Sequence, residues 1–158
     1  MSERNTEHPN YNDIVEWLKK DPVCNIEGVE DDGLVTTIRT TYFEDFKIGV
    51  YLYKEDFGRI EIMSSPRLLT EEAKVFEYTS DKDINRFKTQ LSIDLLKIGI
   101  FCSVETNKNG NFIGLTLLYP LFFESLKREK LMEAIHALAR SCLIVALQFD
   151  KFVLDYKR

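Results

Sequence analysis

The residue types that most often carry catalysis or bind metals are few in this chain and lie far apart. The two histidines are His8 and His136, and the three cysteines are Cys24, Cys102 and Cys142. A zinc site or a redox pair needs cysteines or histidines at close spacings such as CxxC or HExxH, and neither spacing occurs. The sequence therefore predicts no metal site, with Cys102 and Cys142 as small core residues and His136 facing solvent.

Acidic clusters are the second class of residues that could do chemistry. The run Glu30-Asp31-Asp32-Gly33 has the composition of a calcium loop, but the alternating oxygen ligands and the bidentate glutamate of an EF-hand are missing. We therefore expect residues 23–33 to form a solvated loop. The pairs Glu71-Glu72 and Asp81/Asp83 are expected at helix N-termini, where the helix dipole favours negative charge.

No motif of a nucleotide-binding or hydrolytic enzyme is present. The patterns GxxxxGK[ST], GxGxxG and GxSxG are all absent, so the sequence predicts no cofactor and no catalytic residue. Arg39 and Lys47 on a strand face suggest either an anion site or a solvated sheet face, and the second is favoured. The net charge of −5 opposes nucleic-acid binding, which needs lysine and arginine against phosphates.

The composition is that of a globular protein with one domain. The chain has 158 residues, 44% of them hydrophobic and 30% charged, which predicts a flexible tail over residues 1–10 and a single α+β domain over residues 11–158. No apolar run approaches the roughly 18 residues that a membrane span needs. An odd number of cysteines without a secretion signal predicts a cytoplasmic location.

The longest predicted element is a helix from Lys127 to Phe149, which contains no glycine or proline. An apolar residue recurs on it at steps of three and four, which places these residues on one helix face. The second half, residues 142–147, is apolar all round. Such a helix needs cover on more than one side, and we expect the sheet to wrap around it.

The other predicted elements give a fold class. Asn109-Gly110 is a strong hairpin signal, and residues 66–80 show only a helical turn that opens at Thr70. The fold class is α+β, with a five-stranded antiparallel sheet packed on the long C-terminal helix and two further helices. The two further helices are expected at residues 11–20 and 81–98, and the strands at residues 34–42, 46–53, 59–64, 100–105 and 111–119.

Two groups of apolar side chains are candidates for a dimer or partner interface. One lies on the second sheet face, which is not cleanly polar, and the other on helix 81–98. A large exposed apolar patch marks a partner surface; equally, helix 81–98 or residues 66–80 can cover this face within one chain. The candidate interface residues are Phe87, Leu91, Leu95, Tyr51, Tyr53, Phe101 and Phe112.

The order of elements over residues 11–149 resembles the type III secretion chaperone-like fold. The resemblance lies in the succession helix, three strands, helix, two strands, helix, and it extends to small uncharacterised prokaryotic families that share this fold. It implies a homodimer that binds a segment of a partner polypeptide. It carries over no catalytic residue.

Two functions are therefore expected. The first is a non-enzymatic cytoplasmic interaction module, chaperone-like and homodimeric, that holds part of another protein. The alternative is a small-molecule-binding or enzymatic domain with a pocket between the sheet and the long helix.

Overall fold

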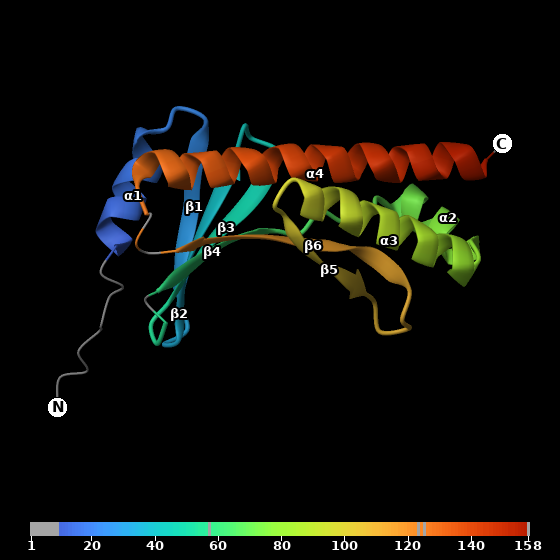
Figure 1. Cartoon of the computed structure of the whole chain (residues 1–158), viewed down its shortest axis with the longest axis horizontal. Helices are drawn as coiled ribbons and strands as arrows, with labels where there is room; N and C mark the ends of the chain where they lie inside the picture. Colours follow the sequence, from blue (N-terminus) through green and yellow to red (C-terminus); the bar gives the residue numbers. More distant parts are fainter. Residues whose placement is uncertain (1–9, 57, 123, 125, 158) are drawn as a thin grey trace. The chain divides into compact units, whose positions relative to one another are not determined.

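The computed structural model describes residues 10–56, 58–122, 124 and 126–157. Over these residues the fold is α+β, with four helices and an antiparallel sheet of six strands (Figure 1). The predicted tail over residues 1–10 lies, apart from Asn10, outside the described part, as does His8. The helices are α1 (Tyr11–Lys20), α2 (Thr70–Tyr78), α3 (Asp81–Lys97) and α4 (Arg128–Tyr156). The strands are β1 (Cys24–Asp31), β2 (Val35–Tyr42), β3 (Phe46–Tyr53), β4 (Arg59–Ser64), β5 (Phe101–Thr106) and β6 (Phe112–Phe122).

The chain divides into two compact units. The first unit consists of Met1–Met63 and Pro120–Ala137, and the second of Ser64–Tyr119 and Leu138–Arg158. Both β6 and α4 therefore belong in part to each unit.

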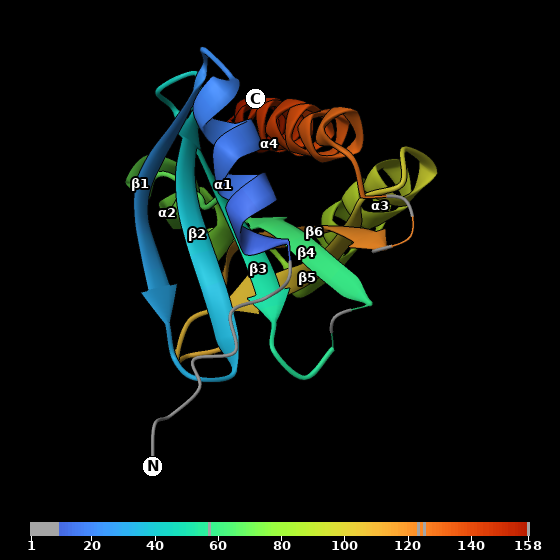
Figure 2. The ribbon, with the colours of Figure 1, turned by 90° about the vertical axis from the view of Figure 1, so that its left-hand side faces the viewer.

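The first unit is a four-stranded meander with α1 over one of its faces (Figure 2). β2 and β3 pair without a register shift from Val35↔Tyr53 to Tyr42↔Phe46. Alternate residues of these strands face inward because side chains of a strand point to opposite sides. The fully buried side chains of this unit include Ile14, Leu18, Ile38, Ile48, Val50, Leu52, Ile60, Ile62, Leu131 and Ile135.

The prediction of a loop over residues 23–33 is wrong, because β1 occupies most of it. β1 pairs antiparallel with β2, and a β-bulge interrupts the pairing between Ile26 and Gly28. Cys24 and Ile26 are half-buried whereas Asn25 and Glu27 are exposed, which is the alternation of a strand. The acidic residues that favour a loop also suit an edge strand, where charge prevents further pairing. The sheet therefore has six strands and not five.

The second unit contains α2, α3, the β5–β6 hairpin and the last part of α4. The predicted boundaries of α3 are confirmed by its caps. Ser80 Oγ accepts a hydrogen bond from the Asp83 N–H at 3.2 Å, which satisfies a free donor at the helix start. At the other end, the Ile100 N–H donates to the Leu95 carbonyl at 3.0 Å and Gly99 has φ +81°. This is a Schellman motif, which requires a residue in the left-handed region after the helix.

Two elements of this unit extend beyond their predicted limits. The helical turn expected at Thr70 is the start of a complete helix, α2, so the fold has three helices besides α4 and not two. β6 continues past Pro120 to Phe122, although the sequence predicts that the strand ends at Tyr119. Proline fits an extended backbone and lacks only an N–H donor.

Five phenylalanines from α2, α3, β6 and α4 form the aromatic core of the second unit. The rings of Phe76 and Phe152 stack with centroids 4.5 Å apart, and those of Phe87 and Phe152 lie 4.7 Å apart. Phe112 and Phe149 complete the cluster, 5.2 Å and 6.2 Å from Phe76. Such ring pairs add to the free energy gained by burying apolar area, and they fix α2 against its neighbours.

The expectation that α4 is enclosed on several sides is wrong for its second half. Val145 and Phe149 are buried, but Leu143, Ile144 and Leu147 are 50%, 40% and 58% exposed. The helix also continues past Phe149 to Tyr156. In the described part of the chain, no helix combines the length and the apolar character that crossing a membrane requires.

Candidate functional site

The structure places the cysteines and His136 where they do no chemistry together. Burial raises the pKa of the Cys24 thiol to about 11, against a weaker opposite effect of a hydrogen bond with Thr40. Burial also raises the pKa of Cys142, so both remain thiols at neutral pH, and a thiol is a poor nucleophile. Cys102 Sγ lies 3.4 Å from Ser92 Oγ. His136 is exposed, as predicted.

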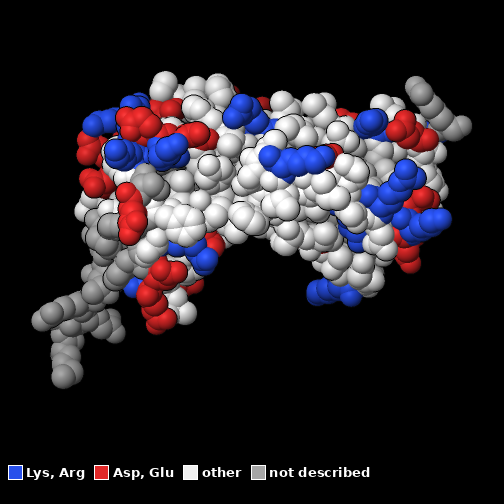
Figure 3. All heavy atoms as spheres, in the orientation of Figure 1, with Lys and Arg blue, Asp and Glu red and all other residues white. Residues whose placement is uncertain are grey.

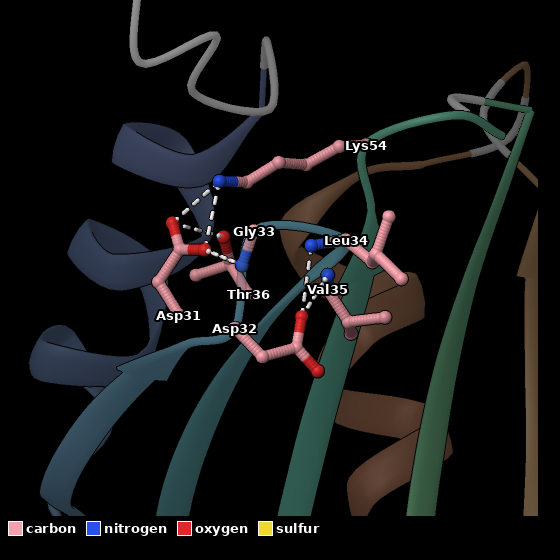
Figure 4. A network of polar contacts seen from close by, with 7 residues as sticks. All are labelled: Asp31, Asp32, Gly33, Leu34, Val35, Thr36 and Lys54. Atoms are coloured by element: carbon pink, nitrogen blue, oxygen red, sulfur yellow. Dashed lines mark hydrogen bonds and ion pairs between the residues drawn. The ribbon is translucent and has the colours of Figure 1, made fainter. Parts of the chain in front are cut away.

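The acidic turn between β1 and β2 uses its carboxylates to hold the backbone (Figure 4). Asp31 accepts hydrogen bonds from the Gly33 N–H at 2.8 Å and from Lys54 Nζ at 2.6 Å. Asp32 Oδ1 accepts from the N–H groups of Leu34 and Val35, both at 2.8 Å. These bonds lower the pKa of both carboxyl groups, with Lys54 the largest cause for Asp31 and the Val35 N–H for Asp32.

This geometry explains the acidic run without calcium. The Lys54 ammonium already supplies a cation to Asp31, and the bonded oxygen of Asp32 points at backbone donors (Figure 4). Over the described residues, no group of three or more His, Cys, Asp or Glu side chains is arranged to hold a metal ion.

The outer sheet face of the first unit carries a polar network and no open anion site at Arg39. Arg39 Nη2 lies 3.0 Å from Glu30 Oε1 across the β1–β2 pair. Tyr53 Oη donates to Glu61 Oε2 at 2.5 Å, and Arg59 Nη2 lies 3.0 Å from Glu61 Oε1. Burial, followed by the Glu61 carboxylate, raises the pKa of Tyr53 to about 12. This face is held together by its own contacts.

The seven predicted interface residues are divided between core and surface. Leu91, Leu95 and Phe112 are buried, and Phe87 is half-buried within the aromatic cluster of the second unit. These four side chains are therefore covered by other residues of the same chain. Tyr51 and Tyr53 are half-buried on the outer face of β3, and Phe101, at the start of β5, is 51% exposed.

The exposed face of α4 is the surface that the sequence prediction missed. Leu147, Leu154 and Ile144 recur at steps of three and seven, so they share one helix face. Leu154 is 62% exposed, which is similar to the exposure of Leu147. In Figure 3 the charged atoms over the middle of α4 are mostly those of Lys and Arg, set among uncharged atoms. We refer to Leu143, Ile144, Leu147 and Leu154 as the α4 stripe. Residues 142–147 are apolar all round in the sequence, and this was the available signal.

A hollow of about 570 Å³ lies beside this stripe, between α3 and α4 of the second unit. Phe87 and Phe152 contribute apolar surface to it, and Lys151 and Arg86 contribute positive charge. The remaining lining residues are Thr79, Asp83, Gln90, Gln148, Asp155 and Tyr156. The Tyr156 hydroxyl donates to the Tyr78 carbonyl at 3.0 Å, which ties the end of α4 to α2.

Comparisons with known proteins establish the fold and the family. The search of curated proteins gave no match. A crystal structure of an uncharacterized protein from Methanothermobacter thermautotrophicus is similar, with a TM-score of 0.78 and 17% sequence identity over 90% of this chain and 97% of that chain. At this identity the likeness shows a shared fold alone. A family model described as an uncharacterized conserved protein, DUF2299, matches residues 10–149. The chain therefore belongs to the DUF2299 family.

Proposed function

We propose that the protein is a non-enzymatic cytoplasmic interaction module that works as a homodimer and holds a segment of a partner polypeptide on α4. This is the role that the resemblance to the type III secretion chaperone-like fold implies. The observation that carries the proposal is the α4 stripe, whose four apolar side chains are each at least 40% exposed.

The stripe has the geometry of a docking surface for a helix. Its members share one face of a 29-residue helix, and an amphipathic partner helix places its own apolar residues at the same spacing. Exposed apolar side chains that lie side by side are costly in water, so a contiguous set on a folded protein marks a binding surface. Single exposed leucines such as Leu69 carry no such meaning.

The homodimer is supported by the edge strand β5. Among the described residues β5 pairs with β6 alone, and its free edge exposes Phe101 and Val104. Its single charged residue, Glu105, forms an ion pair with Arg67, with Nη2 and Oε2 3.1 Å apart. An edge strand of this kind is open to pairing with another strand.

Site-specific photo-crosslinking tests the partner-binding role. A benzoylphenylalanine placed at Leu147 should crosslink to a distinct polypeptide in native extract, and one placed at the exposed Lys82 of α3 should not. Leu143→Lys should lower the yield at Leu147 at least ten-fold, because a buried ammonium disrupts an apolar contact. Leu69→Lys, the matched change at an exposed leucine outside the stripe, should leave it unchanged. Crosslinks at Leu147 only between two copies of this chain, or equal products at Lys82, would contradict the proposal.

The second candidate function is a small-molecule-binding domain, and the hollow between α3 and α4 favours it. Its volume is within the range of ligand pockets, and it combines aromatic surface with opposite charges. Native mass spectrometry of the purified protein should then show a bound compound that is lost in Lys151→Ala.

A further inference from the structure

Two positive charges share the helix face of the α4 stripe. Arg140, Ile144, Leu147, Lys151 and Leu154 follow one another at steps of four, three, four and three, which is the spacing of a single contact seam along a helix. Arg140 and Lys151 are both exposed. At a rise of about 1.5 Å per residue, their Cα atoms are about 16 Å apart along the helix axis.

These two cations are not neutralised by the rest of the described chain. No ion pair joins either of them to a described residue, whereas Lys130 and Lys97 are paired with neighbours on their own helices. Lys151 also lines the hollow beside the stripe, together with Arg86 of α3. Asp83 and Asp155 line the same hollow, so the positive charges that count here are Arg140 and Lys151 on the seam itself, next to exposed apolar side chains.

The acidic side chains of this region lie off the seam. Asp150 interacts with Glu72 of α2, and Asp83 is bonded by the Ser80 hydroxyl at 2.6 Å. Asp155 and Asp83 line the hollow beside the stripe. Between Arg140 and Lys151 the seam itself carries no negative charge.

We propose that the segment held by α4 is an amphipathic helix whose apolar face also carries two acidic residues about three turns apart. Its apolar side chains pack on Ile144, Leu147 and Leu154, and its carboxylates meet Arg140 and Lys151. Charge pairs of this kind select the partner and its register more than they add affinity. This inference rests on the proposed function, because it specifies the partner for the same surface.

Two synthetic peptides provide the test. Both have 18 residues with leucines at heptad spacing; the acidic peptide carries glutamates beside the leucines, and the basic peptide carries lysines at the same positions. Fluorescence anisotropy with the full chain should show that the acidic peptide binds at least ten-fold more tightly. This preference should shrink as salt is added, because exposed charges are screened.

Charge reversal on the protein should reverse the preference. In the double variant Arg140→Glu/Lys151→Glu the basic peptide should become the better ligand. Lys82→Glu/Lys108→Glu changes the net charge equally at two exposed positions off the seam and should keep the acidic preference. Arg140→Gln/Lys151→Gln, which introduces no repulsion, should bind both peptides about equally and serves if the reversed variant does not fold.

Equal binding of the two peptides by the unmodified chain would overturn the inference, as would reversal variants that behave like the off-seam control. If neither peptide binds but Leu147 still crosslinks to a polypeptide, the inference fails and the proposed function stands. If neither peptide binds and Leu147 crosslinks to no polypeptide, the inference and the proposed function are both overturned.

Discussion

Glu72 is a carboxylic acid that the second unit removes from water. It lies in the first turn of α2, and its Oε2 accepts a hydrogen bond from the Leu69 N–H at 2.6 Å. Burial raises the pKa of Glu72, and a side-chain hydrogen bond and the negative charge of Asp150 raise it further; the Leu69 N–H acts in the opposite direction. The folded state therefore holds a proton on this group more strongly than the unfolded chain does.

This shift predicts a dependence of stability on pH. Because the pKa of Glu72 is higher in the folded state, its contribution is complete below its ordinary value of 4.5 and is lost as pH rises through the folded-state value. In Glu72→Gln, whose amide oxygen can still accept from Leu69, this loss disappears. Urea unfolding at several pH values should show the variant gaining stability relative to the parent as pH rises above 4.5. Glu71→Gln, at the exposed neighbour paired with Lys74, should follow the parent profile, and parallel profiles for Glu72→Gln would show that burial does not shift its pKa.

At the scale of elements, the segment from Pro66 to Leu68, here called the strap, bonds to β6 along its backbone. The Leu115 N–H donates to the Pro66 carbonyl at 3.1 Å, and the Leu68 N–H donates to the Ile113 carbonyl at 2.9 Å. Arg67 forms a bridge with Gly114 in this strap. A Cβ atom on Gly114 would lie 2.5 Å from the Pro66 oxygen, which is closer than the two atoms can approach. The strap can lie against β6 only because residue 114 is glycine.

Gly114→Ala should therefore displace the strap and destabilise the protein by about 1–3 kcal/mol, the usual cost of overpacking. Chemical unfolding measures this cost, and hydrogen exchange should show faster exchange at the Leu115 and Leu68 amides. Gly28→Ala on β1 is the matched change, because its Cβ would meet only the end of the Arg39 side chain at 3.4 Å; it should change stability by less than about 0.5 kcal/mol. A similar stability loss in both variants would exclude the strap contact as the cause.

The sequence predicts those elements whose boundaries are set by local chemistry. Ser80 and Gly99 mark α3 because capping acts within a few residues, and alternation identifies β3 because one of its faces is buried. β1 is not predicted because it is an edge strand rich in acidic residues, and a bulge between Ile26 and Gly28 interrupts its pairing. α2 escapes prediction because its stability depends on Phe76, whose partners lie on other elements.

The candidate surfaces are predicted less well than the elements, for a physical reason. Leu91 and Leu147 are both leucines on helices with an apolar face, yet Leu91 is buried and Leu147 is exposed. The apolar character of a side chain shows that its burial is favourable, but not whether the same chain or a partner buries it. Only packing distinguishes the two, and packing places Leu91 in the core of the second unit.

At the scale of the whole molecule, the two edges of the sheet differ in their protection against pairing. β1 carries Glu27, Glu30 and Asp31 and a bulge, which are two common devices against edge-to-edge association. The pairing of β5 with β6 is regular from Phe101 to Glu105 and shifts only at the end, between Glu105 and Thr106. The one charged residue of β5, Glu105, is bonded by both Arg67 and Thr116. If two copies of β5 pair antiparallel over their six residues, each Glu105 faces Cys102 of the other copy, so like charges do not meet. Such a pairing is symmetric and closes into a dimer.

Two valines allow the proposed dimer to be tested with a matched control. Val104 on β5 is 41% exposed and Val29 on β1 is 44% exposed, so a lysine at either position alters one edge by the same chemistry. Light scattering after size-exclusion chromatography should show the parent at twice the mass of one chain. Val104→Lys should raise the dimer dissociation constant at least ten-fold, because an ammonium on the edge must be desolvated for strands to pair, whereas Val29→Lys should leave it unchanged. In the unmodified chain, β5 amides should exchange more slowly as protein concentration rises, and β1 amides should not. A parent that is monomeric at every concentration would contradict the homodimer, and a dimer that persists in Val104→Lys would place its interface elsewhere than β5.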